Sequence, residues 1–182
     1  MIIRPAVTKD IDEIKRLIDI LQVTRKQKDW KEKTSGLFEY PKSKEELTQA
    51  LNPYFIVGET NQGIRGYSLA YDNNFFKSNY GNTEHLEWRF LLDQIKGDYL
   101  YIDQLGVLNP GSLGSGRIAN ALTEKEIKLA RTKRLPRILA YVCEKPLPNK
   151  QSFRFLKRKG FERLIEVPIE EGIVLGLHEL RL

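Results

Sequence analysis

The chain is 182 residues long and carries 30 basic and 24 acidic side chains, which gives it a formal net charge of +6. Its 41% apolar and 30% charged residues are typical of a globular domain, and we expect one domain over residues 1–182. No apolar run approaches the ~18 residues of a membrane span, and charges interrupt the N-terminus where a secretion signal is apolar. We therefore expect a cytoplasmic protein with no membrane partner.

The cysteine and histidine content excludes several kinds of site. Cys143 is the only cysteine, and His85 and His178 are far apart in the sequence, so we expect neither a disulfide framework nor a metal. The basic residues are spread over several short runs and no nucleic-acid-binding signature accompanies them. We therefore place them on solvent-exposed helix faces or in local phosphate contacts, and expect no nucleic-acid partner.

The N-terminal third predicts a strand and two helices. The strand covers residues 2–7, and Pro5 indicates an edge position in a sheet. Thr8 is the expected N-cap of the first helix, whose apolar residues recur at helical spacing. These residues are Ile11, Ile14, Leu17, Ile18 and Leu21. Ser43 and Glu46 form a capping box for the second helix, which ends near residue 51.

The middle of the chain predicts a hairpin about a turn at residues 61–63, followed by a helix that Gly97 ends. The expected elements are strands over 54–59 and 64–71, a loop over 72–82, a helix over 84–96 and a strand over 99–108. The apolar face of this helix is made of Trp88, Leu91, Leu92 and Ile95.

The C-terminal half predicts two further helices, each followed by a strand, and a closing hairpin. The expected elements are a glycine-rich turn over 111–116, helices over 117–133 and 149–159, and strands over 137–143, 161–169 and 173–180. The order is β-α-α-β-β-(α)-β-α-β-α-β-β, which indicates a mixed α/β fold.

The glycine-rich turn is the first motif that carries chemistry. Gly111-x-x-Gly114-x-Gly116 lies between a strand and a helix. Such a turn exposes backbone N–H groups at the positive end of the helix dipole, and glycines let a pyrophosphate approach closely. The order matches neither the dinucleotide-binding pattern nor the P-loop. On the turn alone, a purely structural role is an equally good interpretation.

A second motif follows the next strand and reads Asn149-x-x-Ser152-x-x-Phe155-Leu156-x-x-Lys159-Gly160-Phe161. The chain also opens with Ile3-Arg4-Pro5-Ala6, followed by Asp10 and Ile14. Together these segments resemble the GNAT superfamily of acyltransferases. Its phosphate loop is Gln/Arg-x-x-Gly-x-Gly/Ala, and its later motif is Asn-x-x-Ala/Ser-x-x-hydrophobic-Tyr-x-x-hydrophobic-Gly-Phe. The resemblance covers nearly the whole chain in the order of strands and helices.

The resemblance implies a GNAT-like fold whose fourth and fifth strands splay apart. It implies an N-acetyltransferase that moves an acetyl or other acyl group from acetyl-CoA to a primary amine of a small molecule or protein. The pyrophosphate would bind the backbone amides of Leu113, Gly114, Ser115, Gly116 and Arg117. The pantetheine would lie near the helix side formed by Asn149, Ser152, Phe153 and Leu156, although Asn149 is equally a plain N-cap.

The implied reaction needs oxyanion donors and a base. Attack of an amine on a thioester creates an oxyanion, for which we expect the backbone N–H groups of Val107 and Leu108, freed where the strands part. A charged amine must first lose a proton, and Asp103 and Glu144 are the candidate acceptors. The alternatives are a hydrogen-bonded strand carboxylate at Asp103 and a solvated loop acid at Glu144.

Two positions depart from the GNAT pattern. Gly111 stands at the Gln/Arg position, and Leu156 stands where the family has a tyrosine that protonates the leaving thiolate. Tyr101, Tyr141 or water would then supply the proton, or the thiolate would leave unprotonated. The same departures favour an alternative function, an acyl-CoA-binding module with little or no turnover.

The acceptor site of the family corresponds here to residues 22–42 and about 166–173. Aromatic residues of the first segment would line a pocket or form a satellite cluster, and they are Trp30, Phe38 and Tyr40. Acids of the second would attract a cationic amine or are ordinary turn residues, and they are Glu166, Glu170 and Glu171. The helix over 84–96 would cover the cleft, form a homodimer face or pack in the core.

Overall fold

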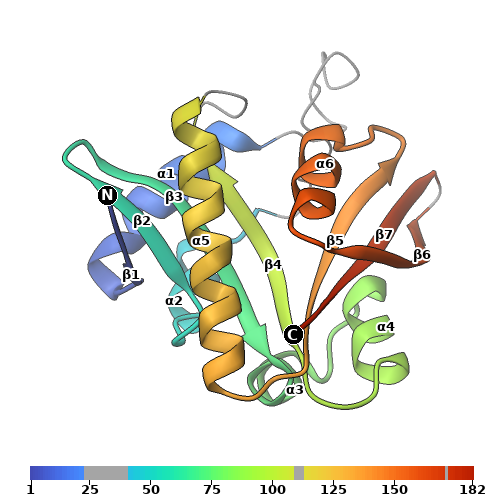
Figure 1. The fold of residues 1–182 in the computed structure, drawn as a ribbon. Helices are drawn as coiled ribbons and strands as arrows, with labels where there is room; N and C mark the ends of the chain where they lie inside the picture. Colours follow the sequence, from blue (N-terminus) through green and yellow to red (C-terminus); the bar gives the residue numbers. More distant parts are fainter. Residues whose placement is uncertain (23–40, 109–112, 171) are drawn as a thin grey trace.

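The structure is a computed structural model that describes residues 1–22, 41–108, 113–170 and 172–182. In these ranges a mixed sheet of seven strands has the order β1-β2-β3-β4-β5-β7-β6 (Figure 1). The strands are β1 (Ile2–Pro5), β2 (Ile56–Thr60), β3 (Gly63–Asp72), β4 (Leu100–Val107), β5 (Arg137–Lys145), β6 (Glu162–Glu170) and β7 (Ile173–Arg181). The helices are α1 (Ile11–Leu21), α2 (Lys44–Gln49), α3 (Asn73–Tyr80), α4 (Leu86–Gln94), α5 (Leu113–Thr132) and α6 (Lys150–Arg158). The predicted mixed α/β class is confirmed.

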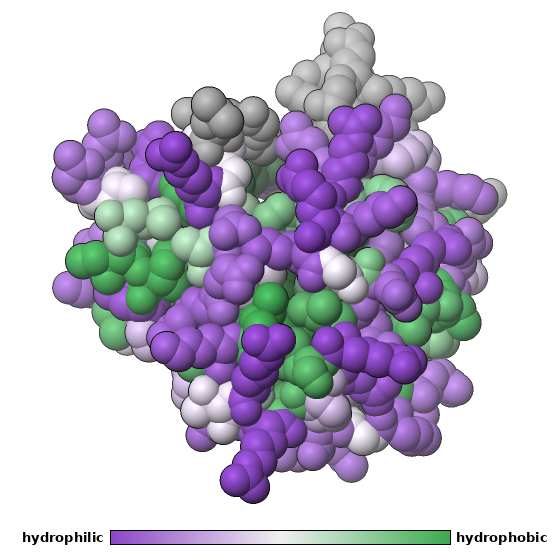
Figure 2. Space-filling view, viewed as in Figure 1, coloured by the Kyte–Doolittle hydropathy of each residue, from purple (hydrophilic) through white to green (hydrophobic). Residues whose placement is uncertain are grey.

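Helices cover both faces of the sheet. In Figure 1, α5 and α6 lie in front of it and α1 and α2 lie behind it. A buried cluster on the front joins Ile127 of α5 and Leu156 of α6 to the central strands, and a second on the back includes Ile14 of α1 and Leu47 of α2. The front surface is mostly hydrophilic (Figure 2), so the outward sides of its helices face solvent.

Residues 72–82 were predicted as a loop, and this prediction is wrong. Residues 73–80 form α3, whose N-cap is Asp72, because its Oδ1 accepts a hydrogen bond from the N–H of Phe75 at 2.8 Å. Phe76 is fully buried and its ring packs against those of Tyr71 and Trp88. Capping and aromatic packing therefore outweigh the low helix propensity of the asparagines in this segment.

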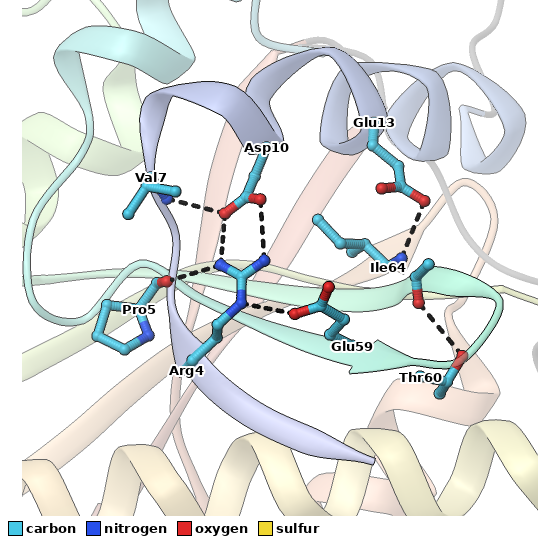
Figure 3. A network of polar contacts seen from close by, with 9 residues as sticks. Arg4, Pro5, Val7, Asp10, Glu13, Glu59, Thr60 and Ile64 are labelled. Carbon is cyan, nitrogen blue, oxygen red and sulfur yellow. Dashed lines mark hydrogen bonds and ion pairs between the residues drawn. The ribbon is translucent and has the colours of Figure 1, made fainter.

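A polar network replaces the predicted N-cap of the first helix. A short 3₁₀ turn, η1 (Thr8–Asp10), precedes α1, and the Thr8 side chain caps neither. Asp10 instead accepts hydrogen bonds from both terminal nitrogens of Arg4, at 2.6 and 2.9 Å, and from the N–H of Val7 at 2.9 Å (Figure 3). Arg4 also donates to Glu59 on β2, so the network fastens the start of α1 to the sheet edge.

We expect Asp10→Asn to lower the free energy of unfolding by about 2 kcal/mol near pH 7, because a buried ion pair loses one partner. The hydrogen bonds from Arg4 lower the pKa of Asp10 below its usual 3.8, against the opposing effect of burial. This stabilisation is present above pH 3.8 and is lost as the pH falls through the lower folded value. Urea unfolding measures it. Asp19→Asn, at an exposed pair with Lys15, should change stability by less than about 0.5 kcal/mol, and an equal loss in both variants would contradict the prediction.

Candidate active site

Strands β4 and β5 part in the middle of the sheet. They pair in parallel only from Leu100 to Ile102 of β4, although β4 continues to Val107 and β5 to Lys145. In Figure 1 the two strands meet at the lower end of the sheet and diverge toward the N-terminal end of α5 and toward α6. The predicted splay of the fourth and fifth strands is confirmed.

A β-bulge marks the point where the strands part. Ala70 of β3 is opposite Ile102, but the next residue pair is Leu69 opposite Gln104, so Asp103 has no opposite residue. Bulges reorient side chains and often lie beside functional sites. Asp103 therefore stands one residue beyond the last β4–β5 pair, with its side chain in the wall of a cavity.

The backbone of β4 beyond the bulge presents N–H groups toward the gap. Leu108 donates its N–H to the carbonyl of Arg65 at 2.9 Å, so the prediction that this group is freed where the strands part is wrong. Because N–H directions alternate along an antiparallel strand, those of Leu105 and Val107 point away from β3 and toward the side that β5 has left. Val107 remains a candidate donor, and Leu105 joins it.

The helix that follows β4 begins earlier than the sequence predicts. α5 starts at Leu113 rather than Arg117, so Gly114 and Gly116 lie in its first turn. Both glycines and Arg117 are exposed, and a Cβ at Gly116 would meet no atom within 4 Å. The first N–H groups of a helix have no carbonyl partner within it, so glycines there cost little helix stability and leave room for an anion.

Two glycines of the sheet bring this helix end close to the strands. Gly58 of β2 and Gly66 of β3 lie opposite each other, and Ile118 of α5 packs over both. A Cβ at Gly66 would lie 2.8 Å from Cγ2 of Ile118, and one at Gly58 would lie 3.0 Å from it. The close approach positions the N-terminal end of α5 beside β4.

A cavity of about 1230 Å³ opens at the bulge, on the face opposite α5 and α6. Strands β4 and β5 contribute Tyr101, Asp103 and Tyr141 to its wall, and α4 contributes Trp88. Asp103 therefore lies both beside the gap between β4 and β5 and in the wall of the cavity.

A buried lysine occupies one corner of this cavity. Lys42 is only 5% exposed, and its Nζ lies 3.2 Å from Oδ2 of Asp103. The same nitrogen lies 4.5 Å from the ring centroid of Trp88 and 5.7 Å from that of Tyr80. Burial is the largest single effect on the pKa of Lys42 and lowers it, but Asp103, Tyr80 and Glu46 together outweigh it, so the pKa lies above the usual 10.5 and the side chain is charged.

No protein-family model matches the chain, and no curated protein matches its sequence. Solved structures match it over its full length. Polyamine N-acetyltransferase of Drosophila melanogaster has a TM-score of 0.65 at 14% identity, with 100% of this chain and 99% of that chain covered. Ribosomal-protein-alanine N-acetyltransferase of Brucella melitensis has a TM-score of 0.65 at 17% identity, with 100% of each chain covered.

A third match is Naa50 of Arabidopsis thaliana in complex with a bisubstrate analogue, with a TM-score of 0.66 at 15% identity and coverage of 100% of this chain and 98% of that chain. The strand order, the splay and these full-length matches agree. The chain has the GNAT fold.

The second sequence motif of the GNAT fold lies on α6, at the edge of the gap. Asn149 is its N-cap, because Oδ1 accepts a hydrogen bond from the N–H of Ser152 at 3.0 Å. Leu156 is buried in the front cluster beside strands β4 and β5. Phe153, predicted to share this side, is 42% exposed and packs edge-on against His178 of β7, whereas Phe155 is partly buried in the front cluster.

The two carboxylates that the sequence offered as bases lie on opposite faces of the sheet. Both oxygens of Glu144 accept hydrogen bonds from Arg163 of β6, at 2.7 and 2.5 Å. Its carboxylate lies over Gly176 of β7, on the face of α6, and is absent from the wall of the cavity that Asp103 lines. The structure therefore places Asp103, which pairs with Lys42, at the parting of the strands, and Glu144, which pairs with Arg163, on the other face.

The two tyrosines that the sequence offered as proton donors for the thiolate both line the cavity. Tyr101 donates its hydroxyl to Oδ1 of Asp103 at 3.2 Å, and Tyr141 donates to the carbonyl of Glu87 at 3.0 Å. Burial is the main cause that raises the pKa of both phenols well above 10, so both stay protonated at neutral pH. Each keeps a proton that it can share by hydrogen bonding.

The predicted acceptor side is described only in part. Trp30, Phe38, Tyr40, Glu171 and the side chain of Glu170 lie outside what the structure describes. Glu166 forms an ion pair with Arg163 and does not line the cavity. The terminal hairpin contributes apolar side chains to it instead, which are Ile169, Ile173 and Leu175.

Sequence reasoning missed the residues that surround the buried ammonium. Lys42 carries no motif, and Tyr80 lay in the predicted loop. Trp88 belonged to the predicted helix face, and it both packs in the core and lines the cavity. Its helix thus adjoins the cleft, which is one of the three roles expected for it.

The described residues contain neither a membrane-spanning helix nor a cluster of metal ligands. Across those ranges no helix is long and apolar enough to cross a membrane. The same residues contain no group of three or more histidine, cysteine, aspartate or glutamate side chains that could hold a metal ion.

Proposed function

We propose that the protein is an acetyl-CoA-dependent N-acetyltransferase that transfers the acetyl group directly to a primary amine. One observation carries the proposal. Asp103, on a bulge at the parting of β4 and β5, lines a cavity on one face, while the exposed N-terminal end of α5 stands at the wide end of the gap. A cosubstrate anchored at the helix end and an amine held in the cavity would meet at this point.

The proposed anchor for the cosubstrate is the first turn of α5. Its backbone amides would bind the pyrophosphate, and they belong to Leu113, Gly114, Ser115, Gly116 and Arg117. Arg117 is the fifth residue of the helix, where N–H groups bond within it, so its exposed guanidinium is the better ligand. The open space beside Gly116 supports the fit of a bulky anion.

The proposed pantetheine path runs through the gap between β4 and β5. The N–H groups of Leu105 and Val107 point toward it and would bind the carbonyl groups that enter it. On α6, Asn149 already uses Oδ1 as a cap, so it would donate from Nδ2. Ser152 and Leu156 would border the path, Leu156 as an apolar wall near the sulfur.

The proposed chemistry assigns each step to a group of this chain. Acetyl-CoA supplies an activated acyl group as a thioester. Asp103 accepts a proton from the bound ammonium, so that the amine nitrogen can form a bond to the thioester carbon. The N–H of Val107 stabilises the oxyanion before the carbon–sulfur bond breaks. The nitrogen loses its second proton to solvent, and the carbon–sulfur bond breaks with its electron pair going to the departing thiolate. Because the pKa of an ordinary thiol is ~8.5, a dedicated acid is not essential at Leu156.

A second candidate function is acyl-CoA binding without turnover. Leu156 favours it, because this side chain is buried in an apolar cluster and cannot donate a proton. Both candidates require the same anchor on α5, so a binding measurement alone does not separate them.

Two measurements on the same preparation separate these functions. Calorimetry with acetyl-CoA tests the anchor, and release of free thiol in the presence of a panel of primary amines tests transfer. We expect both to be positive. Binding without thiol release for any amine would replace the enzyme with the binding module, and absence of binding would overturn both.

We expect Gly114→Asp to weaken acetyl-CoA binding about tenfold or more, since it adds a side chain and a negative charge where the pyrophosphate would lie. Asn120→Asp adds the same charge on the exposed side of the same helix, beyond its first turn, and should leave the Kd nearly unchanged. Calorimetry on both variants, with melting curves to confirm folding, measures the difference. Equal affinities would remove the pyrophosphate from this site.

A further inference from the structure

The Lys42 ammonium is bound as a ligand would be. It lies over the face of the Trp88 ring and near that of Tyr80, with the Asp103 carboxylate 3.2 Å away. An aromatic face and a carboxylate are the groups that recognise an alkylammonium ion, because the ring quadrupole and the negative charge both attract it. Lysine is seldom buried without such partners.

The position of this ion pair is unusual for a purely structural contact. An ion pair that serves only to hold the fold needs no space around it, whereas this one lies in the wall of a cavity of about 1230 Å³. Asp103 is also the bulged residue at the parting of β4 and β5. The ammonium of Lys42 thus occupies the point at which an acceptor amine would have to be held.

The surrounding charges favour a cation at this corner. Three further carboxylates contribute to the cavity wall, those of Glu46, Glu84 and Glu87. The basic side chains of the same wall, among the described residues, are those of Lys42, Lys77 and His85. Exchange of one ammonium for another would leave the net charge of the corner unchanged, and no carboxylate would be left buried without a partner.

We propose that Trp88, Tyr80 and Asp103 form an alkylammonium-binding subsite, and that the side chain of Lys42 fills it until an acceptor amine takes its place. The inference rests on the proposed function for its purpose, since it makes the acceptor a primary alkylamine that is bound in its charged form. The aliphatic stem of Lys42 marks the direction from which such an amine extends. Arylamines and neutral alcohols lack the charge that this corner selects.

Chemical rescue of Lys42→Ala tests the subsite. The variant removes the resident ammonium but keeps the two rings and the carboxylate. We expect n-butylammonium chloride, at 100 times its Kd for the variant, to raise the melting temperature of the variant by roughly 5–11 °C, and that of the wild-type protein by less than 1 °C. The same concentration of n-butanol should leave both melting temperatures unchanged.

Two control variants make the result specific. Lys44→Ala removes an exposed lysine two residues away, whose partner is Asp12, and its melting temperature should not respond to the amine. Lys42→Ala combined with Asp103→Asn removes the carboxylate as well. The Kd of this double variant for n-butylammonium should be at least tenfold higher than that of Lys42→Ala. A response of equal size in Lys44→Ala would show unspecific stabilisation and overturn the subsite.

The rescue also resolves the case in which Lys42→Ala does not fold. Folding of that variant only in the presence of n-butylammonium would support the subsite, and failure to fold with or without it would make Lys42 a structural residue. Nα-acetyl-lysine amide, used as a second ligand, distinguishes a protein lysine from a small amine as the source of the ammonium. Because no arm contains acetyl-CoA, loss of the proposed transferase activity and loss of this subsite are separate results.

Discussion

Replacement of Asp103 by asparagine is expected to lower kcat/KM for acetyl transfer about 10²-fold or more at pH 7. The change preserves the shape of the side chain but removes the group that accepts the proton of the amine. As the pH approaches ~10.4, the pKa of an alkylamine, unprotonated amine becomes abundant and the loss of kcat/KM in the variant should shrink. Rates of thiol release with n-butylamine from pH 6.5 to 9.5 measure both effects, and an acetyl-CoA Kd like that of the wild type shows that the fold persists.

The matching change at Glu144 distinguishes the two carboxylates that the sequence offered. Arg163 holds Glu144 with two hydrogen bonds on the other face of the sheet, so we expect Glu144→Gln to change kcat/KM less than about threefold. A large loss at Glu144 with none at Asp103 would place the proton path on the face of α6. Equal and small effects in both variants would mean that solvent removes the proton.

Replacement of Glu126 by glutamine is expected to raise the free energy of unfolding at pH 7 by at least about 1.4 kcal/mol, the equivalent of one pKa unit. Glu126 lies on α5 and is fully buried against the sheet, where neither carboxyl oxygen makes a well-directed hydrogen bond within the described residues. Burial raises its pKa well above the usual 4.5, against a smaller opposing effect of the Ser68 hydroxyl. Above pH 4.5 the folded protein therefore retains this proton more than the unfolded chain does.

The sign of this effect gives it a distinct pH dependence. The contribution of Glu126 is fully present below pH 4.5, and it is lost by about 1.4 kcal/mol per pH unit as the pH rises toward the folded value. Glutamine has no such proton, so the two proteins should be similar near pH 4.5 and diverge up to pH 8. Urea unfolding at several pH values measures the divergence.

A neighbouring acid on the same helix provides the control. Glu124 is exposed and pairs with Lys159, so Glu124→Gln should change stability by less than about 1 kcal/mol, with no comparable slope. Curves for Glu126→Gln and wild type that stay parallel over this pH range would show that the buried carboxyl is ionised in the folded protein.

Local signals in the sequence determined most of the elements. The helical spacing from Ile11 to Leu21 predicted the buried side of α1, and the Ser43–Glu46 capping box is present with hydrogen bonds of 2.7 and 3.1 Å. Both depend on residues a few positions apart, so no distant contact is needed to recognise them. The order of these elements, with the two motifs, was sufficient for the resemblance that the full-length structural matches confirm at the level of the fold.

Predictions failed where distant contacts override local preference. The segment 73–80 reads as a loop from its asparagines, yet burial of Phe76 between other rings makes it a helix. The start of α5 reads as a turn from its glycines, yet Ile118 packs over Gly58 and Gly66 of the sheet. In both cases a stabilising contact comes from residues outside the segment, and the helix propensity of the segment's own residues gives no information about that contact.

The chemistry of the candidate site was decided by tertiary structure for the same reason. The sequence by itself placed Asp103, Val107 and Leu108 on one strand and Glu144 at the end of the next. Strand pairing decided that Asp103 lies on a bulge and faces a cavity. It also decided that Leu108 donates its N–H to the carbonyl of Arg65 and that Glu144 lies on the other face of the sheet. Lys42 and Asp103 are 61 positions apart, and only the tertiary structure brings them together beside the Trp88 ring. Register and face are properties of paired strands, so a single strand read alone cannot specify them.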